Sequence, residues 1–197
     1  MTTLAPIALL DACVLCSPIK RNLLLNLAAE GLFQARWSED ILAETQRAIA
    51  IIAEKRQHPD PVEHGRRVYE LIVEAFPGQS IGGFDAFNEV LGQLPDEGDR
   101  HVIAAAVKAG ADIIVTENLR DFPRRTLARF DIEPVSSDNF IMDIINLSPD
   151  LSASVIERTR RRFQRADKTP EVMLQDMKRA GLRRCVEYLT QRQSLSD

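Results

Sequence analysis

The sequence predicts an α/β protein with a parallel sheet, followed by a helical segment. Two short apolar runs without a breaker, residues 7–10 and 112–116, are typical of buried strands. Amphipathic segments with helix-capping residues separate these runs, and strands that alternate with helices favour a parallel sheet. From Pro149 onward the chain has helical patterning only. We therefore expect one domain over residues 1–147 and a helical extension over residues 148–197.

In the N-terminal third, capping residues mark where the predicted helices begin. Ser17–Pro18 predicts the cap and first residue of a helix that ends at Gly31. Residues 32–37 predict a short second strand. Ser38 predicts the N-cap of a helix that continues through Ile52, with acidic residues in its first turn, where the helix dipole favours anions.

The remaining elements follow from the same signals. Asp60–Pro61 predicts the start of a helix that ends at Pro77–Gly78. Further along, we expect a loop over residues 79–83, a short helix over 84–94, a helix over 100–109 capped by 96–99, an edge-like strand over 132–135, a short helix from Ser137, and two helices opened by Ser148–Pro149 and Thr169–Pro170, with a break at Gly181.

Composition excludes several classes of protein. Of the 197 residues, 45% are hydrophobic and 27% are charged, which is globular composition and excludes wholesale disorder. No apolar run is long enough to span a bilayer, and the first residues lack the basic region of a secretory signal. The three cysteines are too few and odd in number for a disulfide framework. We therefore expect a cytoplasmic protein with no membrane partner.

Charge is distributed unevenly along the chain. Residues 1–150 carry 14 basic and 23 acidic residues, whereas residues 151–197 carry 11 and 6. An acidic body with a basic C-terminal segment indicates either two functions or one site assembled from both kinds of charge. A merely solvated helix face is the alternative.

Acidic and amide side chains follow the two buried strands at their carboxyl ends. Asp11 follows the first strand, and Asn118 and Asp121 follow the second. Asp99 begins the helix that leads into the second strand, and Glu44 lies among apolar neighbours in an amphipathic helix. In open α/β sheets, ligands bind at the carboxyl ends of the strands, so these side chains are candidates for one site. Taken singly, each aspartate is also explained as a turn or capping residue.

Carboxylates that converge repel one another, and a hard divalent cation removes that cost. Mg²⁺ and Mn²⁺ prefer oxygen ligands, and such ions activate water in phosphodiester hydrolysis. Convergence of these residues would therefore indicate a metal-dependent hydrolase.

Four segments resemble the motifs of PIN-domain nucleases, and they occur in the order found in that family. The segments are residues 9–15, 37–44, 99–106 and 111–123, and the resemblance extends over roughly residues 5–147. Within the family, the chain is similar to VapC-type toxins that carry a helical C-terminal extension.

This resemblance implies a fold, an activity and a set of site residues. The fold would be a PIN-like α/β/α sandwich around a parallel sheet, and the activity a Mg²⁺- or Mn²⁺-dependent endoribonuclease that a cognate antitoxin holds inactive. Relatives often form homodimers. The implied catalytic and metal-binding residues are Asp11, Glu44, Asp99 and Asp121, and the implied supporting residues are Asn118, Thr116 and Asp96. Asn118 stands where many relatives have an aspartate, and it supplies no charge.

Basic residues are candidates for contact with RNA phosphates. They are Lys20 and Arg21 after the first motif, and Arg160, Arg161 and Arg162 in the C-terminal extension. The alternatives are a solvated helix face or, for the C-terminal arginines, a surface that docks an acidic partner such as the antitoxin.

Other functions fit the sequence less well. A non-catalytic PIN-like module that binds RNA or a partner is the main alternative, since Asn118 is neutral. A phospho-aspartate phosphatase needs an aspartate two residues after Asp11, where Cys13 stands. A phosphate loop would need Lys-Ser or Lys-Thr after the glycines, and residues 78–83 lack it. Cys13 and Cys16 have the spacing of a redox pair, but free thiols are the favoured interpretation.

Overall fold

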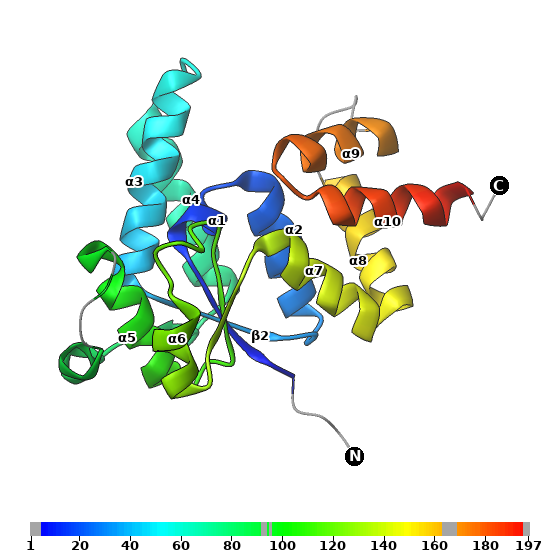
Figure 1. Ribbon diagram of the computed structural model, residues 1–197. Coiled ribbons are helices and arrows are strands. Elements are labelled where there is room, and N and C mark those ends of the chain that lie inside the picture. Colours follow the sequence, from blue (N-terminus) through cyan, green and yellow to red (C-terminus); the bar gives the residue numbers. More distant parts are fainter. Residues whose placement is uncertain (1–4, 92–93, 95, 163–168, 195–197) are drawn as a thin grey trace.

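A computed structural model of the chain describes residues 5–91, 94, 96–162 and 169–194 (Figure 1). Its elements in chain order are β1 (Ile7–Leu10), α1 (Ala12–Leu15), α2 (Pro18–Ala29), β2 (Gln34–Ser38), α3 (Glu39–Lys55), α4 (Pro61–Ala75), β3 (Ser80–Ile81), the 3₁₀ helices η1 (Asp85–Val90) and η2 (Glu97–Asp99), α5 (Arg100–Ala109), β4 (Ile113–Val115), α6 (Arg124–Leu127), the 3₁₀ helix η3 (Ala128–Phe130), β5 (Glu133–Val135), α7 (Ser137–Leu147), α8 (Pro149–Arg162), α9 (Pro170–Arg179) and α10 (Arg183–Ser194).

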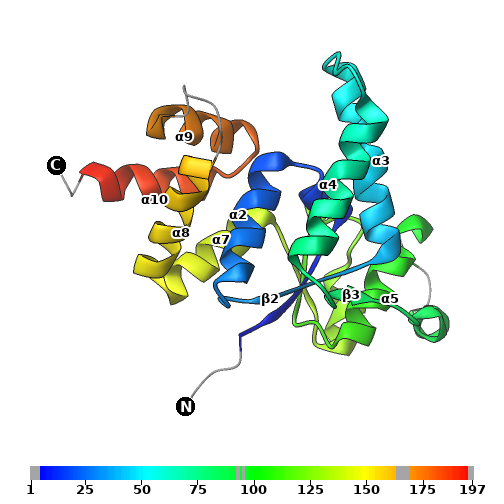
Figure 2. The same ribbon diagram turned by 180° about the vertical axis from the view of Figure 1, so that it is seen from behind.

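The predicted parallel sheet is confirmed. Within the described residues it has five strands in the order β3-β2-β1-β4-β5, and every pairing is parallel. The central strand β1 is fully buried from Ala8 to Leu10, which explains its apolar sequence. Helix α5 lies on one side of the sheet and α2 and α7 lie on the other, an α/β/α arrangement that is clear in both views (Figures 1 and 2).

The register of the two central strands places the candidate residues side by side. Leu10 of β1 pairs with Val115 of β4, so the residues that follow them, Asp11 and Thr116, leave the sheet at the same edge. The backbone N–H of Asp11 donates to the carbonyl oxygen of Val115 at 3.1 Å and extends the pairing by one step. This edge is the carboxyl end of the sheet, where parallel α/β folds bind their ligands.

Helices α3 and α4 form a hairpin that projects beyond the carboxyl end of the sheet (Figure 1). The Ser38 hydroxyl caps α3 by accepting from the Ile41 backbone N–H, and the Asp60 carboxylate caps α4 in the same way. Gly65 lets the helices touch, because a Cβ at this position would lie 2.6 Å from the Gln46 carbonyl oxygen. The hairpin is therefore held by close backbone packing.

The helices after residue 148 pack against the body of the protein. The Asp138 carboxylate in α7 accepts the backbone N–H groups of Arg184 and Cys185 at 2.9 and 3.1 Å, which fixes the start of α10. Arg158 of α8 forms an ion pair with Glu30 at 2.5 Å. The buried core continues from the sheet into α8, α9 and α10. The boundary predicted between residues 147 and 148 stays a prediction.

The structure corrects the expected loop over residues 79–83, because residues 80 and 81 form strand β3 beside β2. A two-residue strand depends on backbone pairing with its neighbour, which composition does not reveal. Part of the predicted helix over residues 84–94 is 3₁₀ rather than α, and α1 was not predicted. Among the described residues, no helix combines the length and the apolar character needed to cross a membrane.

Candidate active site

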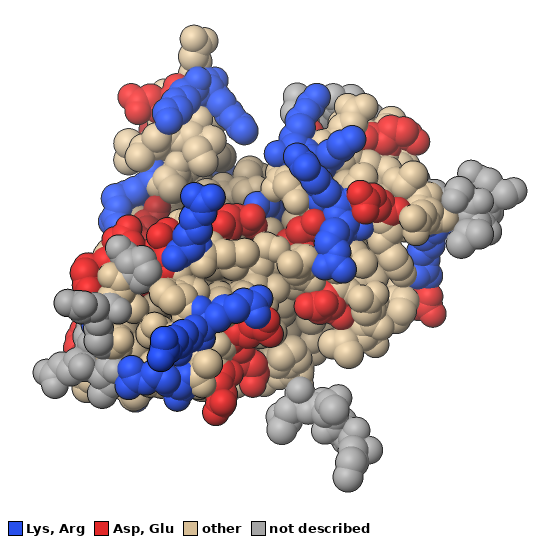
Figure 3. All heavy atoms as spheres, viewed as in Figure 1, with Lys and Arg blue, Asp and Glu red and all other residues tan. Residues whose placement is uncertain are grey.

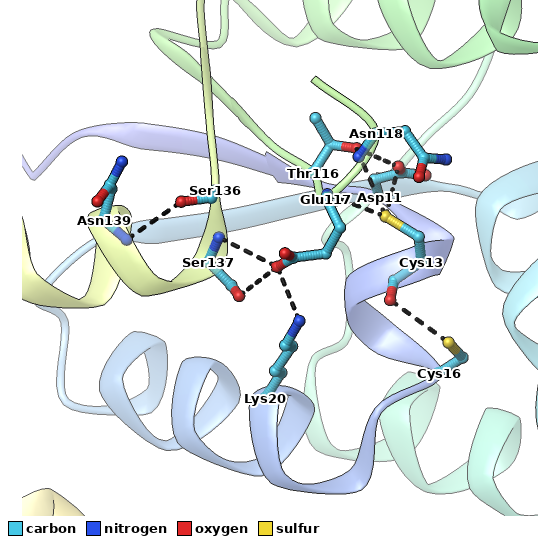
Figure 4. A network of polar contacts seen from close by, with 10 residues as sticks. All are labelled: Asp11, Cys13, Cys16, Lys20, Thr116, Glu117, Asn118, Ser136, Ser137 and Asn139. Atoms are coloured by element: carbon cyan, nitrogen blue, oxygen red, sulfur yellow. Dashed lines mark hydrogen bonds and ion pairs between the residues drawn. The ribbon is translucent and has the colours of Figure 1, made fainter. Parts of the chain in front are cut away.

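Asp11 is held at the carboxyl end of β1 by two side chains from the same edge of the sheet (Figure 4). It is 4% exposed. Its Oδ2 accepts a hydrogen bond from the Thr116 hydroxyl at 2.7 Å and another from the Cys13 thiol at 2.9 Å. Among the hydrogen bonds of the described residues, none involves Oδ1 of Asp11, which leaves that oxygen available to a ligand.

Cys13 acts here as a neutral donor. Burial, and then the charge of Asp11, raise the pKa of the Cys13 thiol to about 12. Its sulfur also accepts the backbone N–H of Glu117 at 3.2 Å. The free thiols expected at Cys13 and Cys16 agree with the structure, in which Cys185 is also free. The bond from Cys13 to the Asp11 carboxylate was not predicted.

Thr116 ties the loop after β4 to Asp11. Its side chain is fully buried, and its hydroxyl oxygen accepts the backbone N–H of Asn118 at 3.0 Å while donating to Asp11. The Asn118 carbonyl then accepts the N–H of Asp121 at 2.9 Å, forming a turn. The Asn118 side chain is exposed and that of Asp121 is partly exposed.

A second network behind this loop was missed by the sequence analysis. Glu117 Oε1 accepts from the Ser137 hydroxyl and lies 2.9 Å from Lys20 Nζ (Figure 4). Burial acts to raise the pKa of Glu117, but the bonds from Ser137 and Lys20 hold it below its usual range. These residues come from α2, the loop after β4, and α7, so no local pattern could have revealed the network.

Asp99 faces the other carboxylates. It occupies the N-cap position of α5 but makes no side-chain capping bond, so the helix does not use its carboxylate. Burial raises the pKa of Asp99 to about 6, and the charges of Asp11, Asp96 and Asp121 add to the effect, while His101 opposes it. The charges of three carboxylates therefore act on the partly buried carboxyl group of Asp99. Four of the predicted acidic residues lie near one another: Asp11, Asp96, Asp99 and Asp121.

Glu44 lies at the side of this neighbourhood, on α3. Its Oε1 is 3.6 Å from Nε2 of His101, in the first turn of α5. That nitrogen is buried, and at this distance it has no hydrogen-bond partner. His101 Nδ1 is 2.8 Å from the Gly98 carbonyl oxygen. Glu44 and His101 therefore link α3 to the helix that carries Asp99.

The acidic side chains are near one another without forming a closed cage. Among the described residues, no three His, Cys, Asp or Glu side chains lie close enough together to hold one metal ion. Asp96 is exposed, and its Oδ1 accepts the Gly98 backbone N–H at 2.7 Å, which is the loop-capping alternative considered for it. The arrangement is therefore an open group of carboxylates in the described residues.

The predicted RNA-contacting residues differ in accessibility. Lys20 is 7% exposed and is paired with Glu117, so its charge is used inside the fold. Arg21 is 9% exposed. Arg160 and Arg161 both bond to Glu157, at 2.5 and 2.8 Å, and their hydrogen bonds lower the pKa of Glu157 to about 2. The Arg162 side chain lies outside the described residues.

Acidic and basic side chains lie in different places around a notch in the molecular surface. Figure 3 shows a notch between the tip of the α3–α4 hairpin and helices α9 and α10, with basic side chains on both sides and acidic side chains along its floor. Basic side chains on both sides of the notch produce a potential that attracts a polyanion.

Comparisons with known proteins agree with the fold. Residues 8–120 match the PIN domain family, and residues 137–191 match the VapC50 C-terminal domain family. A 58-residue stretch, 29% of this chain, is 41% identical to the Mycobacterium tuberculosis protein named "Putative ribonuclease VapC50". The match spans about a third of that relative, 34% of its length. No solved structure matches.

The first of these matches covers more than half of the chain. It includes Asp11, Glu44, Asp99 and the strand-end loop that begins at Thr116. The second match covers the helices that pack on α2 and α7. The chain therefore belongs to the PIN domain family, with a C-terminal extension of the VapC50 type.

Proposed function

We propose that this protein is a metal-dependent endoribonuclease and the toxin of a toxin–antitoxin pair. One observation carries the proposal: the pKa of Asp99 is raised to about 6 by burial and by the carboxylates of Asp11, Asp96 and Asp121. Perturbed carboxyl groups at the ligand-binding edge of an α/β sheet are typical of active sites. The PIN domain match and the similarity to a named ribonuclease support the same activity.

The donor set fits Mg²⁺ or Mn²⁺. All the candidate ligands are carboxylate oxygens, which these hard ions prefer over nitrogen or sulfur. An open site suits this chemistry, because Mg²⁺ is usually bound by one or two carboxylates, with water and substrate phosphate completing its octahedron. Asp11 through Oδ1, with Asp99, would form the core of the site, and Glu44 and Asp121 would complete it.

The chain's own residues prepare this site for an anionic substrate. Thr116 and Cys13 hold Oδ2 of Asp11 and so fix the orientation of its carboxylate. Asp99 keeps its carboxylate free of the α5 backbone. A divalent ion, when bound, supplies positive charge that stabilises the developing charge on the phosphate and lowers the pKa of water. The protein then contributes position and charge rather than a nucleophile.

The test is cleavage of labelled RNA by purified protein with Mg²⁺, with Mn²⁺ and with EDTA, beside Asp99→Asn. Asp143→Asn, at an exposed position on α7, is the matched control. Metal-dependent fragments that Asp99→Asn loses and Asp143→Asn retains would support the nuclease. RNA binding without cleavage would favour the non-catalytic module, for which the neutral Asn118 is the supporting observation.

The proposed antitoxin partner is tested by a separate experiment. Resemblance to VapC-type proteins supports an antitoxin partner, and the resemblance extends through the C-terminal helices. The candidate is a small protein encoded beside this chain's gene. Co-purification of the two proteins, together with suppression of cleavage by the small protein, would support the pairing, whereas unchanged cleavage at excess small protein would contradict it. Sedimentation of the toxin alone tests the proposed homodimer.

A further inference from the structure

A small pocket lies between the α3–α4 hairpin and the segment that joins α1 to the first turn of α2. Its volume is about 190 Å³, and its polar lining consists of Cys16, Arg21, Arg56, His58 and His64. Apolar side chains of α3 and Pro18, the first residue of α2, complete the wall. The proposed metal site uses none of these residues, and Arg21 is one of the basic residues expected to contact RNA phosphates.

The pocket lining carries basic groups and no acidic one. The acidic residues next along the chain are engaged elsewhere, since Asp60 caps the N–H of Glu63 at 3.1 Å, and Glu63 pairs with Arg66 at 2.5 Å. Among the ion pairs of the described residues, none involves Arg21 or Arg56. Two guanidinium groups therefore face the pocket without a carboxylate to neutralise them.

Arg21 is the unusual group, because a buried cation without a countercharge is costly. Only 9% of the residue is exposed, and Nη1 donates a 2.8 Å hydrogen bond to the Leu15 carbonyl oxygen. Burial lowers the pKa of Arg21 to about 10. The neighbouring Cys16 gives no compensation, since burial raises the pKa of its thiol and keeps it neutral.

The two histidines add donors on the same wall. Their rings are 4.7 Å apart, centroid to centroid. His58 Nδ1 accepts the backbone N–H of Asp60 at 3.1 Å, so the proton of the neutral ring resides on Nε2, which is then a donor. Burial first, and then His58 and Arg21, lower the pKa of His64. An anion in the pocket would relieve this repulsion.

From these groups we propose that the pocket binds a phosphate group. Guanidinium groups and imidazole N–H donors are the side chains that recognise phosphate oxygens, and the pocket also lies at the N-terminal end of the 12-residue helix α2. Pockets for drug-sized molecules have volumes of about 300–1,000 Å³, so this smaller pocket suits a single anion. The phosphate is either free inorganic phosphate or the terminal phosphate of an RNA chain. Phosphate binding in this pocket does not depend on RNA cleavage by the protein.

The three histidines of the chain provide the readout. Imidazole NMR signals are followed in the metal-free protein with EDTA, as inorganic phosphate is added at constant ionic strength with chloride as the balancing anion. The signals of His58 and His64 should shift with a saturating curve, while that of His101, in the active-site region, stays in place. Three signals that move together, or none that moves, would overturn the proposal.

Two variants separate the pocket from general surface charge. Arg56→Gln removes an exposed guanidinium of the pocket and should weaken phosphate binding about tenfold, as expected for one charge-assisted hydrogen bond. Arg125→Gln, at an exposed position on α6, is the matched control and should leave the curve unchanged. Equal curves in both variants would contradict the assignment.

Two RNA oligomers distinguish the sources of the phosphate. A short RNA with a 5′-phosphate and the same RNA with a 5′-hydroxyl are titrated against the metal-free protein. A shift of His58 and His64 with the phosphorylated oligomer only would identify the RNA terminus as ligand, and a response to inorganic phosphate only would identify the free ion. Both results support the pocket, and neither requires the nuclease activity to be present.

Discussion

The Thr116 hydroxyl donates a 2.7 Å hydrogen bond to Oδ2 of Asp11, a residue 105 positions earlier in the chain. Both groups are buried, and Thr116 also accepts the N–H of Asn118. We expect Thr116→Val to lower the free energy of unfolding by about 1–3 kcal/mol, because it leaves polar partners unsatisfied. Cleavage should fall more than stability alone explains, since Asp11 loses its orientation.

Thr116→Ser is the control for that prediction, because it retains the hydroxyl. Unfolding in denaturant and cleavage rate are measured for both variants. If Thr116→Ser lost as much activity as Thr116→Val, the hydroxyl would not be the group that positions Asp11.

Asp11→Asn and Asp99→Asn should each reduce RNA cleavage by roughly 100-fold or more, the size of effect seen when one electrostatic group is removed from a catalytic site. Folding should survive, because asparagine has the shape of aspartate. Cleavage rate and circular dichroism are the measurements. Retained activity in both folded variants would refute the proposed metal site.

Asp99 also makes stability depend on pH. Its pKa is raised to about 6 in the folded protein from an ordinary value of 3.8, so the folded state binds more protons than the unfolded state between these values. Stability of the metal-free protein should therefore fall as pH rises from about 4 to about 6, and remain lower above that range.

Asp99→Asn removes this loss. In EDTA at pH 7 the variant should be more stable than the parent protein by about 1 kcal/mol, after allowance for solvent screening of a partly exposed group. Below pH 4 the difference should vanish. Chemical unfolding at both pH values checks this, and a variant that is less stable at pH 7 would contradict the assigned cause.

Gly65→Ala should destabilise the α3–α4 hairpin. The added Cβ would lie 2.6 Å from the Gln46 carbonyl oxygen, and this contact belongs to the backbone, which cannot move aside as a side chain can. We expect a loss of about 1–3 kcal/mol, typical of overpacking. Gly82→Ala is the matched control, because its Cβ meets nothing within 4 Å. Thermal unfolding of the two variants should differ clearly.

Replacing Arg160, Arg161 and Arg162 together by glutamine should weaken RNA binding. If all three contact phosphates, the slope of log affinity against log salt should flatten by up to about 2, near 0.7 for each contact with single-stranded RNA. Glu157→Gln, which releases Arg160 and Arg161 from their ion pairs, should have the opposite effect on affinity. An unchanged slope would mean that these arginines form a solvated face.

Much of the fold followed from local sequence. The apolar run at residues 7–10 could only be a buried strand, Ser38 and Asp60 cap helices as predicted, and Gly110 ends α5 in the left-handed conformation with φ of 60°. These outcomes depend on a few neighbouring residues, so their physical causes are visible in the sequence. The parallel sheet followed because strands alternated with helices.

The tertiary structure determined the features that depend on contacts between distant parts of the chain. Strand β3 exists because it pairs with β2, and the Thr116 hydroxyl reaches Asp11 because β4 pairs with β1. The ion pair of Lys20 with Glu117 was not predicted, and the RNA contact expected of Lys20 stays a prediction. Such contacts join residues that are far apart in sequence, and no local pattern specifies them.

The candidate site also combines features that the sequence determines with features that depend on the fold. The sequence by itself determined which acidic residues are present and that Asp11 and Thr116 lie at the carboxyl ends of buried strands. Only the fold decided that Asp11, Asp96 and Asp121 raise the pKa of Asp99, and that Arg21 lines a pocket without a carboxylate. The reason is that charge interactions and burial depend on distances in space, which are set by packing and not by order along the chain.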